Sequence, residues 1–271
     1  MFVKLFKHDF NANIKLLSIL SACALGIGCI CGIIFRLMES LPQNDSLALL
    51  SIPAAIFLIF GILAIVFFPI AVWFMQLLRF YKSRFTDLGY LTFTLPVKTW
   101  HIFMSSALNL LLWSAIGIAV SGISLFVMGI IGSYETLKEI FDVSQTISGL
   151  LFAEISTDNI LTLIFYGLGT VVYSIVEPLF AIILGCTIAK KHKAIATIGI
   201  MYGMSFVTGI LNGIVTAAVS ILSYSGIENG IDSIGTYMNV QYSVMGIIML
   251  GLSAALYPLS IHMMKTKLNL P

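Results

Sequence analysis

The chain has 271 residues, of which 59% are hydrophobic and only 10% are charged. An ordinary soluble domain carries about 25% charged residues, and a soluble fold of this size could not hide so much apolar surface from water. The composition therefore excludes a soluble protein and predicts an all-α polytopic integral membrane protein whose main solvent is the lipid bilayer. The net charge of +2 gives no electrostatic reason to expect a nucleic-acid partner.

Six stretches are long and apolar enough to cross a membrane, because a bilayer core of about 30 Å needs roughly 20 mostly apolar residues. They cover residues 16–35, 47–78, 102–131, 160–189, 194–222 and 243–264. Several exceed the minimum length, which predicts tilted or kinked helices, and Pro53 and Pro69 are possible break points in the second. The sequence therefore predicts a single membrane domain over residues 1–271 with six transmembrane helices.

The basic residues are distributed unevenly between the connections of these spans. Twelve of the fourteen Lys and Arg residues fall before the first span, in the second-to-third and fourth-to-fifth connections, or after the last span, which leaves Arg36 and Lys138 on the other side. Basic residues are retained on the cytoplasmic side of a membrane. Both termini are therefore predicted to be cytoplasmic, in a multi-pass membrane protein.

The first fifteen residues, MFVKLFKHDFNANIK, combine aromatic with basic side chains. Phe2, Phe6 and Phe10 fall near one face of a helix, and the lysines supply the polar part. This pattern predicts an amphipathic interfacial helix over residues 1–15, lying along the cytoplasmic surface before the first span. The alternative is a frayed basic tail that only sets the topology.

Two connections on the predicted extracellular side are long, residues 133–159 and 223–242. In the first, apolar residues approximate a helical stripe, which predicts a short helix on the outer face. The second is rich in Gly and Ser and is predicted to be an irregular external cap.

No enzyme motif is visible. The chain has no G-x-x-x-x-G-K-[ST] phosphate loop, no H-E-x-x-H sequence and no Cys/His cluster with metal-ligand spacing. The four cysteines lie inside hydrophobic runs, where we interpret them as small apolar side chains, and the four histidines lie at predicted cytoplasmic ends of spans. The sequence therefore predicts no catalytic residue, no metal site and no cofactor in this chain.

The most polar long stretch in the first half of the chain is RFYKSRFTDLGYLTFTLPVKTWH, residues 79–101. It lies between the second and third spans on the predicted cytoplasmic side, and it interleaves cationic with aromatic side chains. Two interpretations are open. The segment either fixes the topology and seats the helix ends in the headgroup layer, or it docks into another protein.

Part of this stretch, DLGYLTFTLPVK at residues 87–98, resembles the sequence that follows the second span of type-2 ATP-binding-cassette (ABC) export permeases. The resemblance extends across the chain through six spans, cytoplasmic termini, an N-terminal interfacial helix and an extended outer loop before the last span. In that family, the region between the second and third spans contains a coupling helix that sits in a cleft of a separate ATPase. The resemblance implies that residues 79–101 are such a coupling segment.

The resemblance also implies a location in the bacterial plasma membrane, together with partners and a cargo. The partners are two cytosolic ABC ATPase subunits, which would bind ATP and Mg²⁺, and a second permease copy or paralogue. The cargo moved outward would be amphiphilic, such as an antimicrobial or bacteriocin-like peptide, a drug or a lipid-like molecule. The implied ATPase-coupling residues are Arg79, Phe80, Tyr81, Lys82, Arg84, Phe85, Asp87, Gly89, Tyr90 and Pro96.

Glu177 and Pro178 lie near the middle of the fourth span, where a charged side chain costs about 2.5–3.5 kcal/mol. In one interpretation this is an intramembrane pathway or hinge, in which Glu177 binds a cationic substrate group or a proton and Pro178 weakens the helix. In the other, the carboxyl is neutral and hydrogen-bonded across helices, for instance to Tyr173 or to a Ser or Thr. The first interpretation also fits an ion- or proton-coupled carrier without an ATPase. A non-transporting membrane scaffold is a further alternative.

The fifth span contains Gly199-x-x-x-Gly203 and Gly209-x-x-x-Gly213. Such spacing permits close helix approach, either inside the chain or at a subunit interface.

Overall fold

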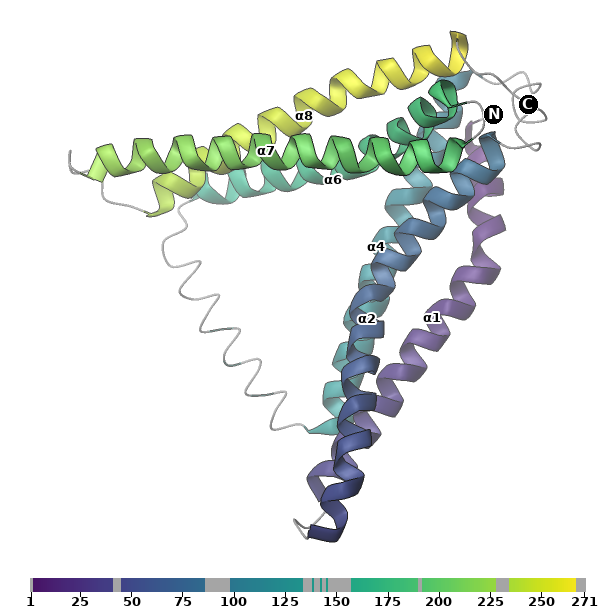
Figure 1. Cartoon of the computed structure of the whole chain (residues 1–271), viewed down its shortest axis with the longest axis vertical. Helices are drawn as coiled ribbons and strands as arrows, with labels where there is room; N and C mark the ends of the chain where they lie inside the picture. The colour runs from purple at the N-terminus through teal and green to yellow at the C-terminus, as the bar shows by residue number, and fades with distance from the viewer. Residues whose placement is uncertain are drawn as a thin grey trace. The chain divides into compact units, whose positions relative to one another are not determined.

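The structure is a computed structural model that describes residues 2–40, 45–85, 98–133, 157–189, 192–227 and 234–266, together with Lys138, Asp142 and Gln145. Its elements are α1 (Phe2–Ser40), α2 (Asp45–Phe85), α4 (Thr99–Gly132), α6 (Thr157–Ile188), α7 (Lys193–Ile227) and α8 (Ile234–Thr266) (Figure 1).

All six of these helices are long and apolar enough to cross a membrane. The prediction of an all-α multi-pass membrane protein is therefore confirmed. Helices are the expected solution because no water in the bilayer core can hydrogen-bond a free backbone N–H or C=O. Pro53 and Pro69 lie inside α2, Pro178 inside α6 and Pro258 inside α8, and none of them ends its helix.

The chain forms two compact units. Unit 1 contains Met1–Arg79 and Leu108–Ile147, and unit 2 contains Phe80–Ala107 and Ser148–Pro271. The helices α2 and α4 each contribute residues to both units, and the packing of each unit is described separately.

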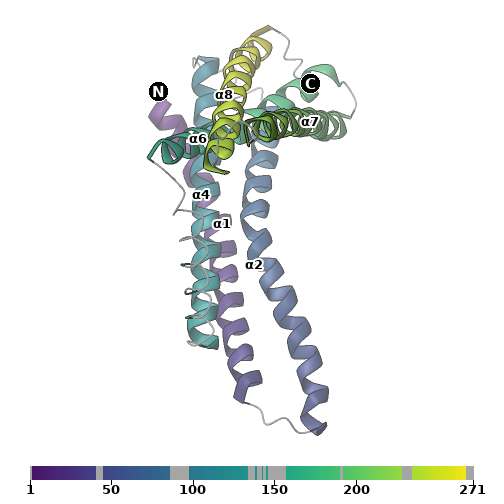
Figure 2. The ribbon, with the colours of Figure 1, turned by 90° about the vertical axis from the view of Figure 1, so that its left-hand side faces the viewer.

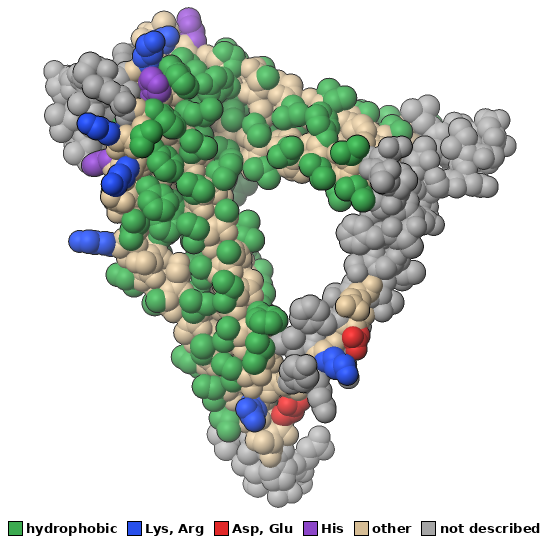
Figure 3. Space-filling model, turned by 180° about the vertical axis from the view of Figure 1, so that it is seen from behind, with side chains coloured by type: hydrophobic (Ala, Val, Ile, Leu, Met, Phe, Trp, Pro, Cys, Tyr) green, Lys and Arg blue, Asp and Glu red, His purple; other side chains and the backbone are tan. Residues whose placement is uncertain are grey.

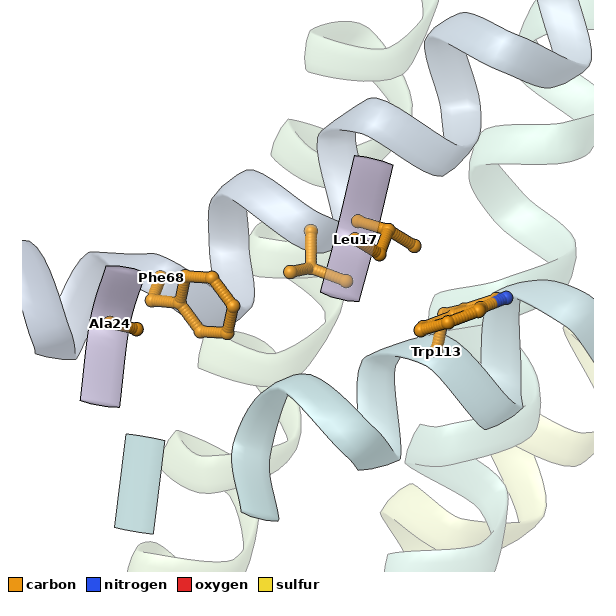
Figure 4. Packing of buried hydrophobic residues seen from close by; sticks show 5 residues of the cluster. Leu17, Ala24, Phe68 and Trp113 are labelled. Carbon is orange, nitrogen blue, oxygen red and sulfur yellow. The ribbon is translucent and has the colours of Figure 1, made fainter. Parts of the chain in front are cut away.

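Unit 1 joins α1, α2 and α4 around one apolar core. Leu17 and Ala24 of α1 pack there with Phe68 and Val72 of α2 and with Trp113 of α4 (Figure 4). Figure 2 shows α1 and α4 running side by side. All three helices contribute residues to this cluster, so the apolar face of each helix is buried by the other two.

Glycine lets α1 and α4 approach closely. A Cβ on Gly28 would lie 2.6 Å from the carbonyl oxygen of Ser124, and one on Gly32 would lie 2.8 Å from that of Met128. Beside them, the Ser124 hydroxyl donates a hydrogen bond to the Ala24 carbonyl at 2.8 Å. Such close packing and interhelical hydroxyl bonds hold membrane helices together, since lipid is as apolar as the side chains and supplies no hydrophobic force between helices.

In unit 2, α6 is the central helix and packs against both α7 and α8. It is 67% buried over its most apolar window, whereas α7 is 6% buried. Of the three helices, α6 therefore has the largest share of its side chains in contact with other parts of the protein. The crossing of α6 with α8 is close at Gly169, where a Cβ would lie 3.1 Å from the Gly246 carbonyl oxygen.

Two expected connections differ from the structure. Residues 2–15 are the first turns of α1 and are continuous with the first span, so no boundary separates an interfacial helix from it. Residues 223–227 continue α7 and residues 234–242 belong to α8, so the predicted irregular cap over residues 223–242 is wrong for these two stretches. The helical penalties of Ser and Gly reach only about 1 kcal/mol per residue, and a helix that is already formed and packed can carry them. Of residues 133–159, Lys138, Asp142 and Gln145 are helical, and most of the remainder lies outside the described residues.

The glycine pairs predicted to bring helices together are not the ones that do so within the described structure. A Cβ on Gly199, Gly203, Gly209 or Gly213 would meet nothing within 4 Å. Close approaches to a neighbouring helix are made instead at other glycines, among them Gly28, Gly32, Gly169 and Gly185.

Charged side chains gather at helix ends, and hydrophobic side chains cover the lengths between them (Figure 3). In unit 1, Arg79 near the end of α2 bonds to Ala12 near the start of α1, so the basic ends of these two helices lie together. Arg36 and Glu39 lie at the opposite end of α1. The assignment of the basic end to the cytoplasm stays a prediction from the positive-inside rule.

Candidate functional site

Unit 2 contains a cluster of polar side chains on the facing sides of α6 and α7, which we call the Glu177 cluster. Its members are Tyr173 and Glu177 of α6 and Ser205 and Thr208 of α7. Tyr173 and Glu177 are one helical turn apart, as are Ser205 and Thr208, so each pair lies on one face of its helix. The carboxyl therefore has hydroxyl neighbours from both helices.

The two α6 members of the cluster are buried, whereas Ser205 of α7 is exposed and Thr208 is partly exposed. Glu177 is 9% exposed and Tyr173 is 7% exposed. The Ser205 hydroxyl donates a hydrogen bond to Oε1 of Glu177 at 3.0 Å. The Tyr173 hydroxyl lies within hydrogen-bond reach of the Thr208 hydroxyl. The predicted bond from Glu177 to a hydroxyl on a neighbouring helix is thus present.

The Glu177 cluster lies deep in both spans. Glu177 stands eleven residues before the end of its span at Ile188, a distance of about 17 Å at 1.5 Å per residue. Ser205 stands twelve residues after the start of its span at Lys193, or about 18 Å. In a hydrocarbon core of about 30 Å, both positions are close to the midplane.

Pro178 follows the carboxyl and is fully buried. A proline has no N–H, so the carbonyl of Ser174 lacks its usual helical partner. The helix continues through this point. One backbone bond of α6 is therefore missing within a turn of Glu177, as the hinge interpretation requires.

An apolar, methionine-rich surface borders the cluster. The ring of Tyr173 packs with Met245 and Met249 of α8, and Val215 of α7 adjoins the same group. Methionine side chains are flexible and polarisable, and they adapt to differently shaped neighbours. The cluster therefore joins one carboxyl and several hydroxyl groups to an adaptable apolar wall.

The second predicted site, the start of residues 79–101, is the end of α2. Residues 79–85 are helical, and residues 86–97 lie outside the described residues, among them the predicted coupling positions Asp87, Gly89, Tyr90 and Pro96. The remaining coupling positions are Arg79, Phe80, Tyr81, Lys82, Arg84 and Phe85, and they belong to the last two turns of α2.

The predicted coupling side chains are not equally accessible. Phe80 and Phe85 are 5% and 3% exposed and pack edge to face with ring centroids 5.6 Å apart, and Arg84 is 4% exposed. Lys82 is exposed, and Tyr81 is partly exposed. Burial of the two phenylalanines leaves Tyr81 and Lys82 as the side chains best placed to meet a partner.

Arg79 takes part in a polar network inside unit 1. Its guanidinium donates hydrogen bonds to the carbonyl of Ala12 at 2.7 Å and to the side-chain oxygen of Asn13. The Asn13 amide in turn donates to the side-chain oxygen of Gln76 at 2.8 Å. Asn13 and Gln76 are both buried. The network ties the start of α1 to the end of α2.

We expect Arg79→Ala to destabilise the protein by about 2–3 kcal/mol. The substitution removes two hydrogen bonds from a charged donor and leaves the buried oxygen of Asn13 without its partner, and each such loss costs about 1–3 kcal/mol. Thermal unfolding of the full chain in mild detergent measures the change. Lys82→Ala, which removes an exposed charge three residues after Arg79, is the matched control and should change stability little. Equal stability of the two variants would contradict a supporting role for the network.

Sequence reasoning identified Glu177 and Arg79 but not most of their partners. Ser205, Thr208, Asn13 and Gln76 are ordinary polar residues in apolar or amphipathic runs. The only signal for Asn13 and Gln76 was an amide inside a predicted helix, a group that must find a partner when it is buried. Comparison with family models, curated proteins and solved structures found no match to this chain.

Proposed function

We propose that this chain is the membrane permease subunit of an exporter that is driven by a separate cytosolic ATPase. The chain supplies the membrane path, and two ATPase subunits supply the energy by binding and hydrolysing ATP with Mg²⁺. A second copy of the chain or a paralogue completes the transporter. Its cargo is amphiphilic and moves outward.

One observation carries the proposal. The helix α2 runs without interruption from Asp45 to Phe85, and two residues later the chain enters DLGYLTFTLPVK, the segment that resembles the coupling region of ABC export permeases. With 41 residues, α2 is about 60 Å long at 1.5 Å per residue, twice the thickness of a hydrocarbon core of about 30 Å. A continuous helix of this length can carry a displacement at its basic end into the membrane.

The proposed contact with the ATPase is made by the exposed part of this end. Lys82 offers a cationic group and Tyr81 an amphipathic ring, which suit a cleft that has acidic and apolar walls. Arg84 is buried, so its charge acts within the chain and is a poor choice for testing docking.

The test is copurification. The full chain, isolated from its native membrane in mild detergent, should retain a stoichiometric ATPase whose hydrolysis rises when the two are reconstituted in lipid. Lys82→Glu should lower both the retained ATPase and the stimulated hydrolysis about tenfold, because reversing a charge at a contact costs on the order of 1.4 kcal/mol or more.

The matched control is Lys7→Glu, which reverses an exposed charge at the basic start of α1. It should leave the retained ATPase unchanged. Absence of any ATPase from the wild-type preparation would overturn the proposed function, and equal retention by Lys82→Glu would overturn the proposed contact.

A second candidate function rests on the Glu177 cluster. A buried carboxyl at mid-membrane depth is typical of ion- and proton-coupled carriers. A chain that transports cargo in ATPase-free vesicles, driven by an ion gradient alone, would support that candidate against the first.

A further inference from the structure

We propose that the Glu177 cluster binds the charged group of a hydrophobic organic cation at the middle of the membrane. This inference deepens the proposed export function and rests on it, since it names the cargo class: amphiphiles that carry one positive charge on a large apolar body.

The site contains a carboxyl that no described basic side chain matches at its depth. Among the described residues of unit 2, Lys and Arg lie near helix ends, at Lys82, Arg84, Lys98, Lys193 and Lys265. The described partner that donates a hydrogen bond to Glu177 is the Ser205 hydroxyl, a neutral group. A carboxylate in hydrocarbon is stabilised far more by a cation than by one hydroxyl, so a positively charged ligand is the group that completes this site.

The oxygen groups favour an organic cation over a metal ion. Ca²⁺ takes 6–8 oxygen ligands and Mg²⁺ demands octahedral geometry. The cluster offers one carboxyl and three hydroxyl groups, and no described group of three His, Cys, Asp or Glu side chains could hold a metal ion. A large organic cation with a spread charge is weakly hydrated, so it loses little when it leaves water and needs few ligands.

The border of the site matches an apolar body. Tyr173 presents a ring whose face attracts cations. Met245 and Met249, which are 1% and 8% exposed, pack against that ring, and their unbranched side chains can repack around a ligand. A surface of this kind accepts bulky apolar groups of different shapes, whereas the carboxyl selects for their charge.

The experiment measures binding of tetraphenylphosphonium, a hydrophobic monocation, to the purified full chain in phosphatidylcholine nanodiscs. Equilibrium dialysis with the radiolabelled probe gives saturable binding after subtraction of empty nanodiscs. Triphenylphosphine oxide, which is aromatic and uncharged, reports the apolar contribution alone. Neither nucleotide nor ATPase is present, so the result does not depend on coupling.

The central variant is Glu177→Gln, which keeps the size of the side chain and an oxygen that accepts from Ser205. We expect it to bind tetraphenylphosphonium roughly 10-fold to 100-fold more weakly, the range that corresponds to losing one interaction with a charged group. Glu177→Asp should retain part of the affinity, and binding of the neutral probe should not change. Asp142→Asn, which removes a carboxylate outside the spans, is the charge-matched control and should bind like the wild type.

The outcomes separate this inference from the proposed function. Saturable binding that depends on Glu177 supports the cation site, whether or not an ATPase copurifies. Equal affinity of the wild type and Glu177→Gln, or no saturable binding by the wild type, overturns the cation site. Loss of the copurifying ATPase overturns the export function and leaves the binding result standing.

Discussion

Substituting Gly185 with alanine is expected to cost the protein several kcal/mol of stability and most of its yield of folded chain. A Cβ at this position would lie 2.5 Å from the Thr197 hydroxyl and 2.7 Å from the Cα and backbone nitrogen of Thr197. The hydroxyl can rotate away, but the backbone of α7 can yield only if its approach to α6 opens. Steric insertion into packed sites costs about 1–3 kcal/mol or more, and here the contact is with backbone. Thermal unfolding followed by size-exclusion chromatography measures the loss.

Gly199→Ala is the matched control, because both changes add one methyl group to a helical glycine of unit 2. A Cβ on Gly199 has open space within 4 Å. Alanine favours a helix over glycine by up to about 1 kcal/mol, so this variant should be as stable as the wild type or slightly more stable. If Gly185→Ala were equally well tolerated, the close approach of α6 to α7 at Thr197 would be wrong.

The sequence was sufficient to locate the spans because their signal is composition over about 20 residues, and neither packing nor partners alter it. All six predicted spans coincide with helices. The helix ends were harder to locate. Residues 223–227 and 234–242 include Ser, Gly, Thr, Asn and Gln, and this local composition does not show that a neighbouring helix extends through them. Tyr242 in the second of these stretches stacks on Tyr166 of α6, with ring centroids 5.2 Å apart, and the local sequence does not reveal this contact between helices.

Of the candidate site, only the carboxyl of Glu177 could be predicted from the sequence. A carboxyl in an apolar run stands out in any sequence, so Glu177 could be found without coordinates. Its partner Ser205 could not, because α7 is apolar on nearly all sides and its sequence does not indicate which face meets α6. The same limit applies to Arg79. Its basic neighbours suggested an outward role, but Ala12 and Asn13, more than 60 positions earlier, accept its hydrogen bonds.

Replacing Glu177 with methionine is expected to stabilise the chain while removing its cation binding. Methionine has a similar length, and it suits a border that already contains Met245 and Met249. A charged side chain at this depth costs about 2.5–3.5 kcal/mol, whereas a hydrogen bond between membrane helices returns about 0.6 kcal/mol on average. The single bond from Ser205 therefore does not offset the cost of keeping the carboxyl in the apo protein. We expect the free energy of unfolding to rise by about 1–3 kcal/mol.

The stability of Glu177→Met decides between the two interpretations of this carboxyl. If the main role of Glu177 is to hold α6 and α7 together, replacing it should lower the free energy of unfolding. A Glu177→Met variant as unstable as Gly185→Ala would therefore identify a structural role. If its main role is to bind a ligand, replacing it should instead raise the free energy of unfolding and abolish binding. Ser205→Ala completes the comparison. It removes the same hydrogen bond but leaves the carboxyl, so it should lower stability by less than about 1 kcal/mol and weaken tetraphenylphosphonium binding far less than the loss of the carboxyl does.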